Sequence, residues 1–257
     1  MGEDSSSGSI VSMGRNIILG LASVLLLVLT LACSPAGRES TEETTARTGG
    51  NTTQTDTAET TQASTTKTSR TVGSAEASET LKELTVAQPG SMSGYTREKF
   101  RHWSRAEDFG WAPPQASCDS REAALVRDGK DVRVGNGCKV NSGTWYDPYT
   151  DQTYSNPQDL DIDHVVPLAN AWRSGASSWS DQERERYAND PDVLLSVEDN
   201  ANQEKGDKGP EAWKPPNEAE WCDYAERWVS IKDKYDLSVN ESEKQALEQM
   251  LGTCTGQ

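Results

Sequence analysis

The aromatic residues are distributed very unevenly along the chain, and this distribution decides where a core can form. All 8 Trp, all 7 Tyr and both Phe of the 257 residues lie between Tyr95 and Tyr235. Residues 34–91 contain mainly Thr, Ser, Ala, Gly, Gln and Glu, and such a segment cannot bury enough apolar surface to offset its ordering entropy. We therefore predict one folded domain over residues 92–257, preceded by a disordered linker over residues 34–91.

An apolar run near the N-terminus is typical of an export signal. Residues 17–31 form an apolar run of fifteen residues, which is too short to span a membrane comfortably. Arg15 precedes the run, as expected for a secretory signal. We predict a signal peptide over residues 1–33 and an extracellular location. Because the acidic Glu3 is unusual in such a signal, Met13 is an alternative start.

The end of this run resembles the lipobox of bacterial lipoproteins, in which a Cys becomes the lipid-modified first residue. The segment is Leu29-Thr30-Leu31-Ala32-Cys33-Ser34, and it departs from the usual pattern at Thr30, where Leu is common. The resemblance implies a lipid anchor at Cys33 that holds the domain on the outer face of the cell membrane. The alternative is ordinary secretion with an unmodified Cys33.

Four cysteines remain once Cys33 is set aside, and an even number in an exported chain suggests two disulfides. The sequence alone allows three pairings. We favour Cys118–Cys138 and Cys222–Cys254, because each pair closes a short local loop. No two cysteines are close enough in sequence to form a CxxC zinc site.

The net charge and the His count exclude several functions. The chain has 25 basic and 41 acidic residues, which gives a formal charge of −16. This charge argues against a broad basic coat that wraps duplex DNA. With 2 His in the whole chain, a three-His zinc site is impossible, and no HExxH motif is present. Any catalytic imidazole is therefore His102 or His164.

Periodicity predicts a mixed domain of the α+β class. We expect helices over residues 119–127, 168–172 and 181–187, and strands around residues 132–145 and over residues 160–166. Another helix is expected after Asn217, with Ser238 and Glu241 as the cap of the helix that follows it. The helix that begins after Asn217 carries residues at helical spacing that we interpret as core: Trp221, Tyr224, Ala225, Trp228, Ile231 and Tyr235.

The densest group of chemically active residues is Asp161-Ile162-Asp163-His164, followed about forty residues later by Asn202 and Lys205. A carboxylate and an amide supply the hard oxygen ligands that Mg²⁺ prefers. An imidazole is the usual general base near neutral pH, and Lys binds phosphate as a point charge. Together they suit metal-assisted phosphodiester hydrolysis. Since neighbours on a flat strand point to opposite faces, Asp163 and His164 can serve one site only if the strand ends or twists there.

The segment Asp163-His164-Val165-Val166-Pro167, followed by Asn202-x-x-Lys205-Gly206-Asp207, resembles the HNH endonucleases, which have a ββα-metal (His-Me finger) core. Further segments resemble the secreted bacterial HNH-family proteins related to the C-terminal domain of GmrSD-type restriction enzymes. These are residues 118–121, 127–128, 143–150, 171–176, 187–190 and 211–213. The likeness covers roughly residues 95–254.

This resemblance implies a fold and a set of roles. The fold is an α+β, ββα-metal (HNH) core with small antiparallel strands, additional C-terminal helices and disulfides. His164 is expected to be the general base, while Asp163 and Asn202 hold one divalent cation, Mg²⁺ or Mn²⁺. Asn189 is our choice for the middle HNH residue that steadies the base, with Asp192 as the alternative.

The sequence departs from the family after Asn202, because members often have Arg-Ser where this chain has Gln203-Glu204. An Arg is thus replaced and an acidic residue is gained. We therefore consider Lys205 together with Arg121, Arg127 and Arg173 as candidates for binding the substrate phosphate.

These observations predict a monomeric, exported, metal-dependent endonuclease. DNA is the expected partner, with RNA as a second substrate, and little sequence specificity is expected because no reader domain is present. The alternative is a non-catalytic cell-surface binding module on an HNH scaffold. The acidic net charge and Glu204 favour this alternative, whereas the set of Asp163, His164 and Asn202 favours the enzyme.

Overall fold

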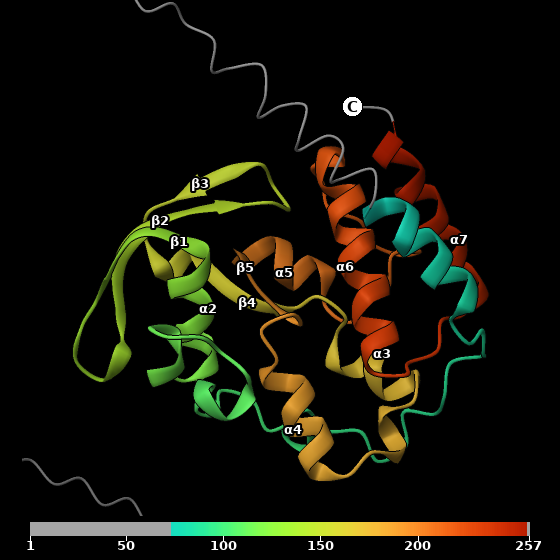
Figure 1. Ribbon diagram of the computed structural model, residues 1–257, viewed down its shortest axis with the longest axis horizontal. Helices are drawn as coiled ribbons and strands as arrows, with labels where there is room; N and C mark the ends of the chain where they lie inside the picture. The colour runs from blue at the N-terminus through green and yellow to red at the C-terminus, as the bar shows by residue number, and fades with distance from the viewer. Residues whose placement is uncertain (1–72, 256–257) are drawn as a thin grey trace, which may run out of the picture. The chain divides into compact units, whose positions relative to one another are not determined.

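The computed structural model describes residues 73–255 (Figure 1). The predicted signal peptide, the lipid anchor at Cys33 and most of the predicted linker lie outside these residues. The described part is a mixed α/β fold with small antiparallel sheets and two disulfides, in agreement with the expected α+β class.

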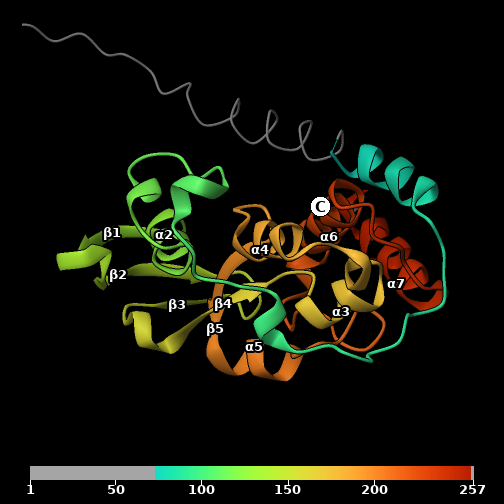
Figure 2. The same ribbon diagram turned by 90° about the horizontal axis from the view of Figure 1, so that it is seen from below.

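Two small antiparallel sheets lie side by side. β1 (Gly129–Val134), β2 (Val140–Asp147) and β3 (Gln152–Tyr154) form the first sheet, while β4 (Leu160–His164) and β5 (Leu194–Glu198) form the second. In both views the second sheet lies between the first sheet and the C-terminal helices (Figure 1, Figure 2).

The helices are short, and the longest is near the C-terminus. They are α2 (Ser120–Asp128), α3 (Leu168–Arg173), α4 (Asp181–Asn189), α5 (Asp199–Lys205), α6 (Trp221–Lys234) and α7 (Glu241–Leu251). Both α3 and α4 are inserted between the paired strands β4 and β5, and α5 follows β5 directly. Within residues 73–255, no helix is both long and apolar enough to cross a membrane.

The aromatic stripe of α6 forms the centre of the larger core, as its helical spacing predicts. Tyr224 and Trp228 are 2% and 0% exposed, and they pack with Tyr149 and Trp213 among other buried side chains. A smaller core lies between α2, β2 and β4, around Trp145. The fold therefore buries most of its aromatic surface on two faces of the strands that carry the candidate site.

The disulfides join Cys118 to Cys138 and Cys222 to Cys254, the pairing that loop length favours. The first links the start of α2 to the β1–β2 hairpin, and the second links α6 to the segment after α7. The expected cap of α7 is wrong: Asn240 and Glu243 form a capping box, so α7 begins two residues later than Ser238 and Glu241 suggest. Both residue pairs, Ser238 with Glu241 and Asn240 with Glu243, could form a capping box, and in the folded protein the second pair does.

The predicted domain boundary at residue 92 differs from the structure. A helix covers residues 73–83, and the figures show it beside α6 and α7 (Figure 1, Figure 2). Leu81 is 1% exposed and joins the larger core together with Ala77 and Leu84. Their i, i+4, i+7 spacing gives the helix one apolar face. A few well-placed apolar residues thus order a segment whose average composition indicates a linker.

Candidate active site

The strand β4 brings Asp163 and His164 to one cavity of about 270 Å³. Asp163 and His164 are neighbours in β4 and pair with successive residues of β5. They can still line the same cavity because β4 ends at His164. The other lining residues come from β4 itself, from the segment before α2, from the start of α3 and the residue before it, and from α5 and the two residues after it: Ile162, Tyr95, Arg97, Pro167, Leu168, Ala169, Asn202, Gly206 and Asp207.

His164 is buried, and its tautomer follows from one contact. Its Nε2 lies 3.0 Å from the Ala188 carbonyl oxygen. Because a carbonyl only accepts hydrogen bonds, Nε2 carries the proton and Nδ1 is the unprotonated nitrogen. Burial lowers the pKa of His164 from its ordinary 6.5 to about 3, and the charges of Arg97, His102 and Lys205 act in the same direction. The imidazole is therefore neutral at physiological pH, the state that a general base requires.

Asn189, the expected middle HNH residue, does not touch His164 through its side chain. The side chain is fully buried. It makes four hydrogen bonds of 2.6–2.8 Å, with Ser104 N, Ser120 Oγ, Arg101 O and Glu185 O. These bonds fix the end of α4, where the Ala188 carbonyl receives His164. Asn189 is thus linked to His164 only through the backbone, whereas the alternative Asp192 pairs with Lys234 at the surface.

Asp163 is held by two donors on the other side of β4. Its Oδ2 accepts from Tyr149 Oη at 2.8 Å, and its Oδ1 accepts from Lys205 Nζ at 2.8 Å. Lys205 is 0% exposed and also donates to the His164 carbonyl at 3.2 Å. The interpretation of Lys205 as a surface phosphate ligand is therefore corrected, because its ammonium group lies inside the fold and is bound by Asp163. Gly206, at φ +54°, turns the chain immediately after it.

Asn202 lies on α5 at the cavity wall. Its Nδ2 donates to Asp161 Oδ2 at 3.1 Å, so the amide is oriented by a second carboxylate from β4. Asp163 and Asn202 together offer the hard oxygen donors that suit Mg²⁺ or Mn²⁺. Each oxygen of Asp163 keeps a lone pair beyond its single hydrogen bond. The donor set therefore fits a divalent cation that completes its shell with water and substrate oxygens.

None of the three candidate arginines lines the cavity, but Arg173 is linked to its wall through Asp207. Arg173 Nη1 pairs with Asp207 Oδ2 at 2.7 Å, and Asp207 lines the cavity. Arg121 instead pairs with Glu122 at 2.6 Å on α2, and it is not among the cavity-lining residues. Arg121 therefore forms a local ion pair within α2, close to the Cys118–Cys138 disulfide.

Four residues lie near His164 or line its cavity, and the sequence singles out only His102 among them, as the other imidazole. Tyr95 and Arg97 line the cavity. The ring centroids of Trp103 and His102 lie 5.9 and 6.3 Å from that of His164. No spacing rule links residues 95–103 to residue 164, because tertiary packing alone brings them together. The one available signal is a local mixture of aromatic and basic residues.

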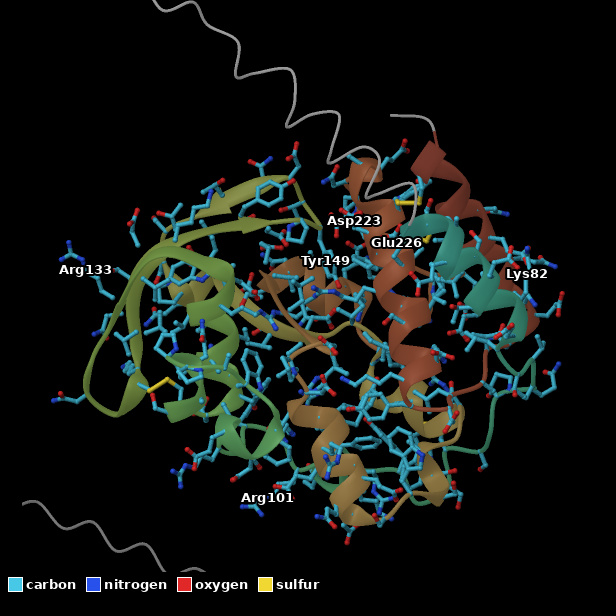
Figure 3. All side chains as sticks on the ribbon, in the orientation of Figure 1. Lys82, Arg101, Arg133, Tyr149, Asp223 and Glu226 are labelled. Atoms are coloured by element: carbon cyan, nitrogen blue, oxygen red, sulfur yellow. A yellow bond between two sulfur atoms is a disulfide. The ribbon has the colours of Figure 1, made fainter. Side chains whose placement is uncertain are left out.

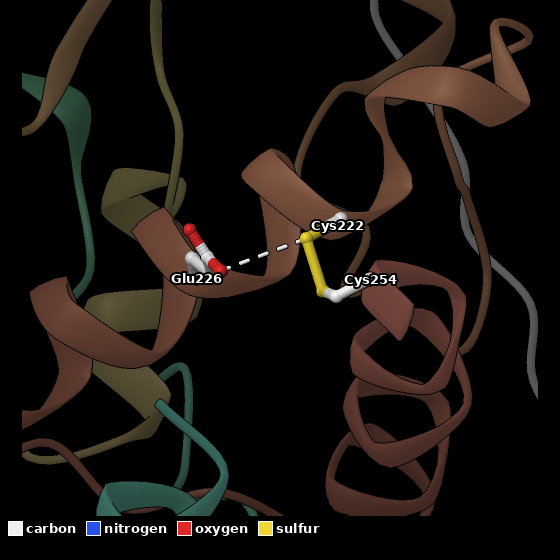
Figure 4. A group of neighbouring side chains, drawn as sticks. All are labelled: Cys222, Glu226 and Cys254. Atoms are coloured by element: carbon white, nitrogen blue, oxygen red, sulfur yellow. Dashed lines mark hydrogen bonds between the residues drawn. A yellow bond between two sulfur atoms is a disulfide. The ribbon is translucent and has the colours of Figure 1, made fainter. Parts of the chain in front are cut away.

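Cys222, Glu226 and Cys254 form the group of ligand-type side chains that lie within 4.8 Å of one another in the described part of the chain (Figure 4). The two sulfur atoms are bonded to each other, and the sulfur of Cys222 lies 3.6 Å from a carboxylate oxygen of Glu226. A disulfide lacks the thiolate that binds metals. This group is therefore a covalent link and not a metal site.

Comparison with known proteins places the chain in a nuclease family. The family model for the C-terminal domain of GmrSD restriction endonucleases matches residues 121–250, and the chain belongs to this family. A relative described as an uncharacterized secreted protein, from Arthroderma benhamiae, is 47% identical over 180 residues, which cover 69% of this chain and 84% of the relative. This relative is fungal, so the resemblance is not restricted to bacterial proteins. No solved structure matches the chain.

Proposed function

We propose that this protein is an exported endonuclease that hydrolyses phosphodiester bonds of DNA, with RNA as a second substrate and with little sequence specificity. One observation supports this most directly. His164 is neutral, has an unprotonated Nδ1 and lines a cavity that also contains carboxylate and amide oxygens. The membership of the chain in the GmrSD C-terminal domain family favours a nuclease over other hydrolases that could use the same groups.

In this proposal, β4, β5 and α5 are the two strands and the helix of a ββα-metal core. The strands are antiparallel, with Asp163 opposite Leu195 and His164 opposite Leu194. α5 follows β5 without a loop and carries Asn202 back to the cavity. The base would come from the end of the first strand and the second ligand from the helix, as that core requires.

His164 would accept a proton from the attacking water through Nδ1, while the Ala188 carbonyl keeps Nε2 protonated and the ring fixed. Asp163 and Asn202 would hold a Mg²⁺ or Mn²⁺ ion. When bound, such an ion would polarise the phosphate and lower the pKa of water, which reduces the basicity required of the imidazole. Lys205 would hold the Asp163 carboxylate in place at the cavity through their ion pair.

The test is nicking of supercoiled plasmid by the purified exported chain with intact disulfides, in Mg²⁺, in Mn²⁺ and in EDTA. His164→Gln is the informative variant, because its amide can still donate to the Ala188 carbonyl. His102→Gln is the matched control, since it removes the other imidazole. We expect metal-dependent nicking that His164→Gln reduces at least about a hundredfold, the scale of general base catalysis, and that His102→Gln reduces far less.

Two results would contradict this proposal. Nicking that persists in His164→Gln means that another group is the base. A folded protein that cleaves neither DNA nor RNA with any metal supports the second candidate, a non-catalytic surface module. The observation that favours this second candidate is the occupation of both oxygens of Asp163 by Tyr149 and Lys205.

We also propose that Cys33 carries a lipid that anchors a monomeric protein to the outer face of the cell membrane. Cys33→Ser should move the protein from the membrane fraction to the medium, while the cleavage activity per molecule stays the same. A protein that is released equally with Cys33 intact is simply secreted. Light scattering of the released form measures the oligomeric state.

A further inference from the structure

The segment from Tyr95 to Arg105 is a local basic region in an acidic protein. It contains Arg97, Lys99, Arg101 and Arg105 against one acid, Glu98, while the chain as a whole has a formal charge of −16. All four basic side chains are exposed. Such a concentration of one charge creates a local potential opposite to that of the whole protein.

This segment is held rigidly beside the candidate active site. Phe100 is 0% exposed and packs against Trp172 and Tyr187. The Arg101 carbonyl accepts a hydrogen bond of 2.8 Å from Asn189 Nδ2, and Trp103 packs against His164. With these positions anchored inside, the neighbouring charged side chains point outward, starting from Arg97 at the cavity wall.

The charges of three of these residues are largely free for a partner. Among the described residues, Arg97 and Lys99 form no salt bridge, and Lys99 Nζ is held over the Trp172 ring at 5.1 Å from its centroid. Arg101 lies 3.5 Å from Glu185, but its side chain is 76% exposed, so water screens this pair strongly. Arg105 is closely paired with Glu107. We define Arg97, Lys99 and Arg101 as the basic strip.

We propose that the basic strip binds the phosphate backbone of the nucleic acid substrate and guides the strand into the cavity at His164. This inference rests on the proposed function. A group of exposed cations close together in the chain, one of which lines the cavity, suits a repeating polyanion, because each Arg can contact a phosphate with two donors and Lys adds a point charge. The strip lies outside residues 121–250, which match the family model.

Sequence-independent phosphate contacts have a measurable signature. Each contact with duplex DNA releases counterions and contributes about 0.9 to the slope of log affinity against log salt. At about 0.15 M salt, the loss of two or three such contacts corresponds to a weakening of about 30- to 170-fold. The slope should fall by about 2 to 3 when the strip is removed.

The experiment compares the wild-type exported chain with two triple variants that lose equal charge. The strip variant is Arg97→Ala, Lys99→Ala, Arg101→Ala, and the control is Lys130→Ala, Arg133→Ala, Lys139→Ala. The control residues are exposed on the β1–β2 hairpin. Figure 3 shows Arg133 on the outer side of this hairpin, and Arg101 apart from it near α4. Binding to a short fluorescein-labelled DNA duplex is measured by anisotropy in EDTA, which prevents hydrolysis, over a range of salt concentrations.

We expect the DNA affinity of the strip variant to fall by about 30- to 170-fold and its salt slope by about 2 to 3. The DNA affinity of the hairpin variant should change by less than about threefold. A further variant, Arg97→Lys with Arg101→Lys, keeps the charges and should keep most of the slope, which excludes misfolding as the cause. Equal losses in both triple variants, or no loss in the strip variant, would overturn the inference. If the wild type still nicks plasmid in these cases, the proposed function stands without the strip. A wild type that neither binds nor cleaves overturns both.

Discussion

Acidification should destabilise the fold through His164, and the magnitude follows from its environment. In the folded protein, burial lowers the pKa of His164 to about 3, whereas in the unfolded chain the imidazole has its ordinary value of about 6.5. Between these values the unfolded state binds a proton that the folded state does not bind, so the free energy of unfolding falls as the pH falls. The charged groups around the ring, Arg97, His102 and Lys205, all oppose its protonation.

The full effect is about 5 kcal/mol, since each pKa unit is equivalent to about 1.36 kcal/mol. Between pH 7 and pH 4.5 the loss should be about 2.5 kcal/mol. The carboxylates also titrate in this range, and His164→Gln provides the matched reference because it keeps the other groups. Urea unfolding of both proteins in EDTA, at a series of pH values, gives the difference that belongs to His164.

The chain offers an independent readout because it has only 2 His. In the NMR spectrum of the untagged protein, one imidazole signal should stay unshifted down to about pH 4.5, while the unfolded protein shows two ordinary titrations. A stability difference that is flat from pH 7 to pH 4.5, or two histidines that both titrate near their ordinary value, would refute the assignment of His164 as a buried neutral base.

Three further predictions concern stability and use chemical or thermal unfolding. Lys205→Met should cost about 3–5 kcal/mol, because it leaves Asp163 buried without its cation; a cost under about 1 kcal/mol would mean that water reaches this pair. Replacing Cys222 and Cys254 by Ser opens a loop with a sequence separation of 32, and the loss should be about 3–4 kcal/mol; unchanged stability would show that packing alone joins α6 to the C-terminus. A chain that begins at residue 92 should be at least about 2 kcal/mol less stable than one that begins at residue 73, because Leu81 loses its buried site; equal stabilities would restore the shorter domain boundary.

Local patterns in the sequence were sufficient for several elements. The stripe from Tyr224 to Ile231 repeats at helical spacing, and it is buried along α6 as that spacing requires. The strand that carries Asp163 and His164 ends close to where Pro167 suggests. In both cases the pattern lies within a few helical turns or strand residues, so the element can be predicted from its own local sequence.

Other parts could not be predicted, because they depend on contacts between distant residues. The segment over residues 73–84 presents Ala77, Leu81 and Leu84 on one face, and their contribution to stability depends on the residues of the larger core against which they pack. Lys205 has the sequence context of a surface cation. Only the position of Asp163, 42 residues away, shows that its ammonium group is buried in an ion pair.

Local sequence features are sufficient to identify the types of group that are available: an Asp-His pair on a strand, an Asn on a later helix and four cysteines at loop-closing distances. Propensity, periodicity and chain connectivity act over short separations, and they were enough for these assignments. The tertiary structure alone decided which groups work together. It placed the Ala188 carbonyl on His164, Lys205 on Asp163 and Arg97 at the cavity wall, because burial, tautomer and charge pairing are set by neighbours that are remote in sequence.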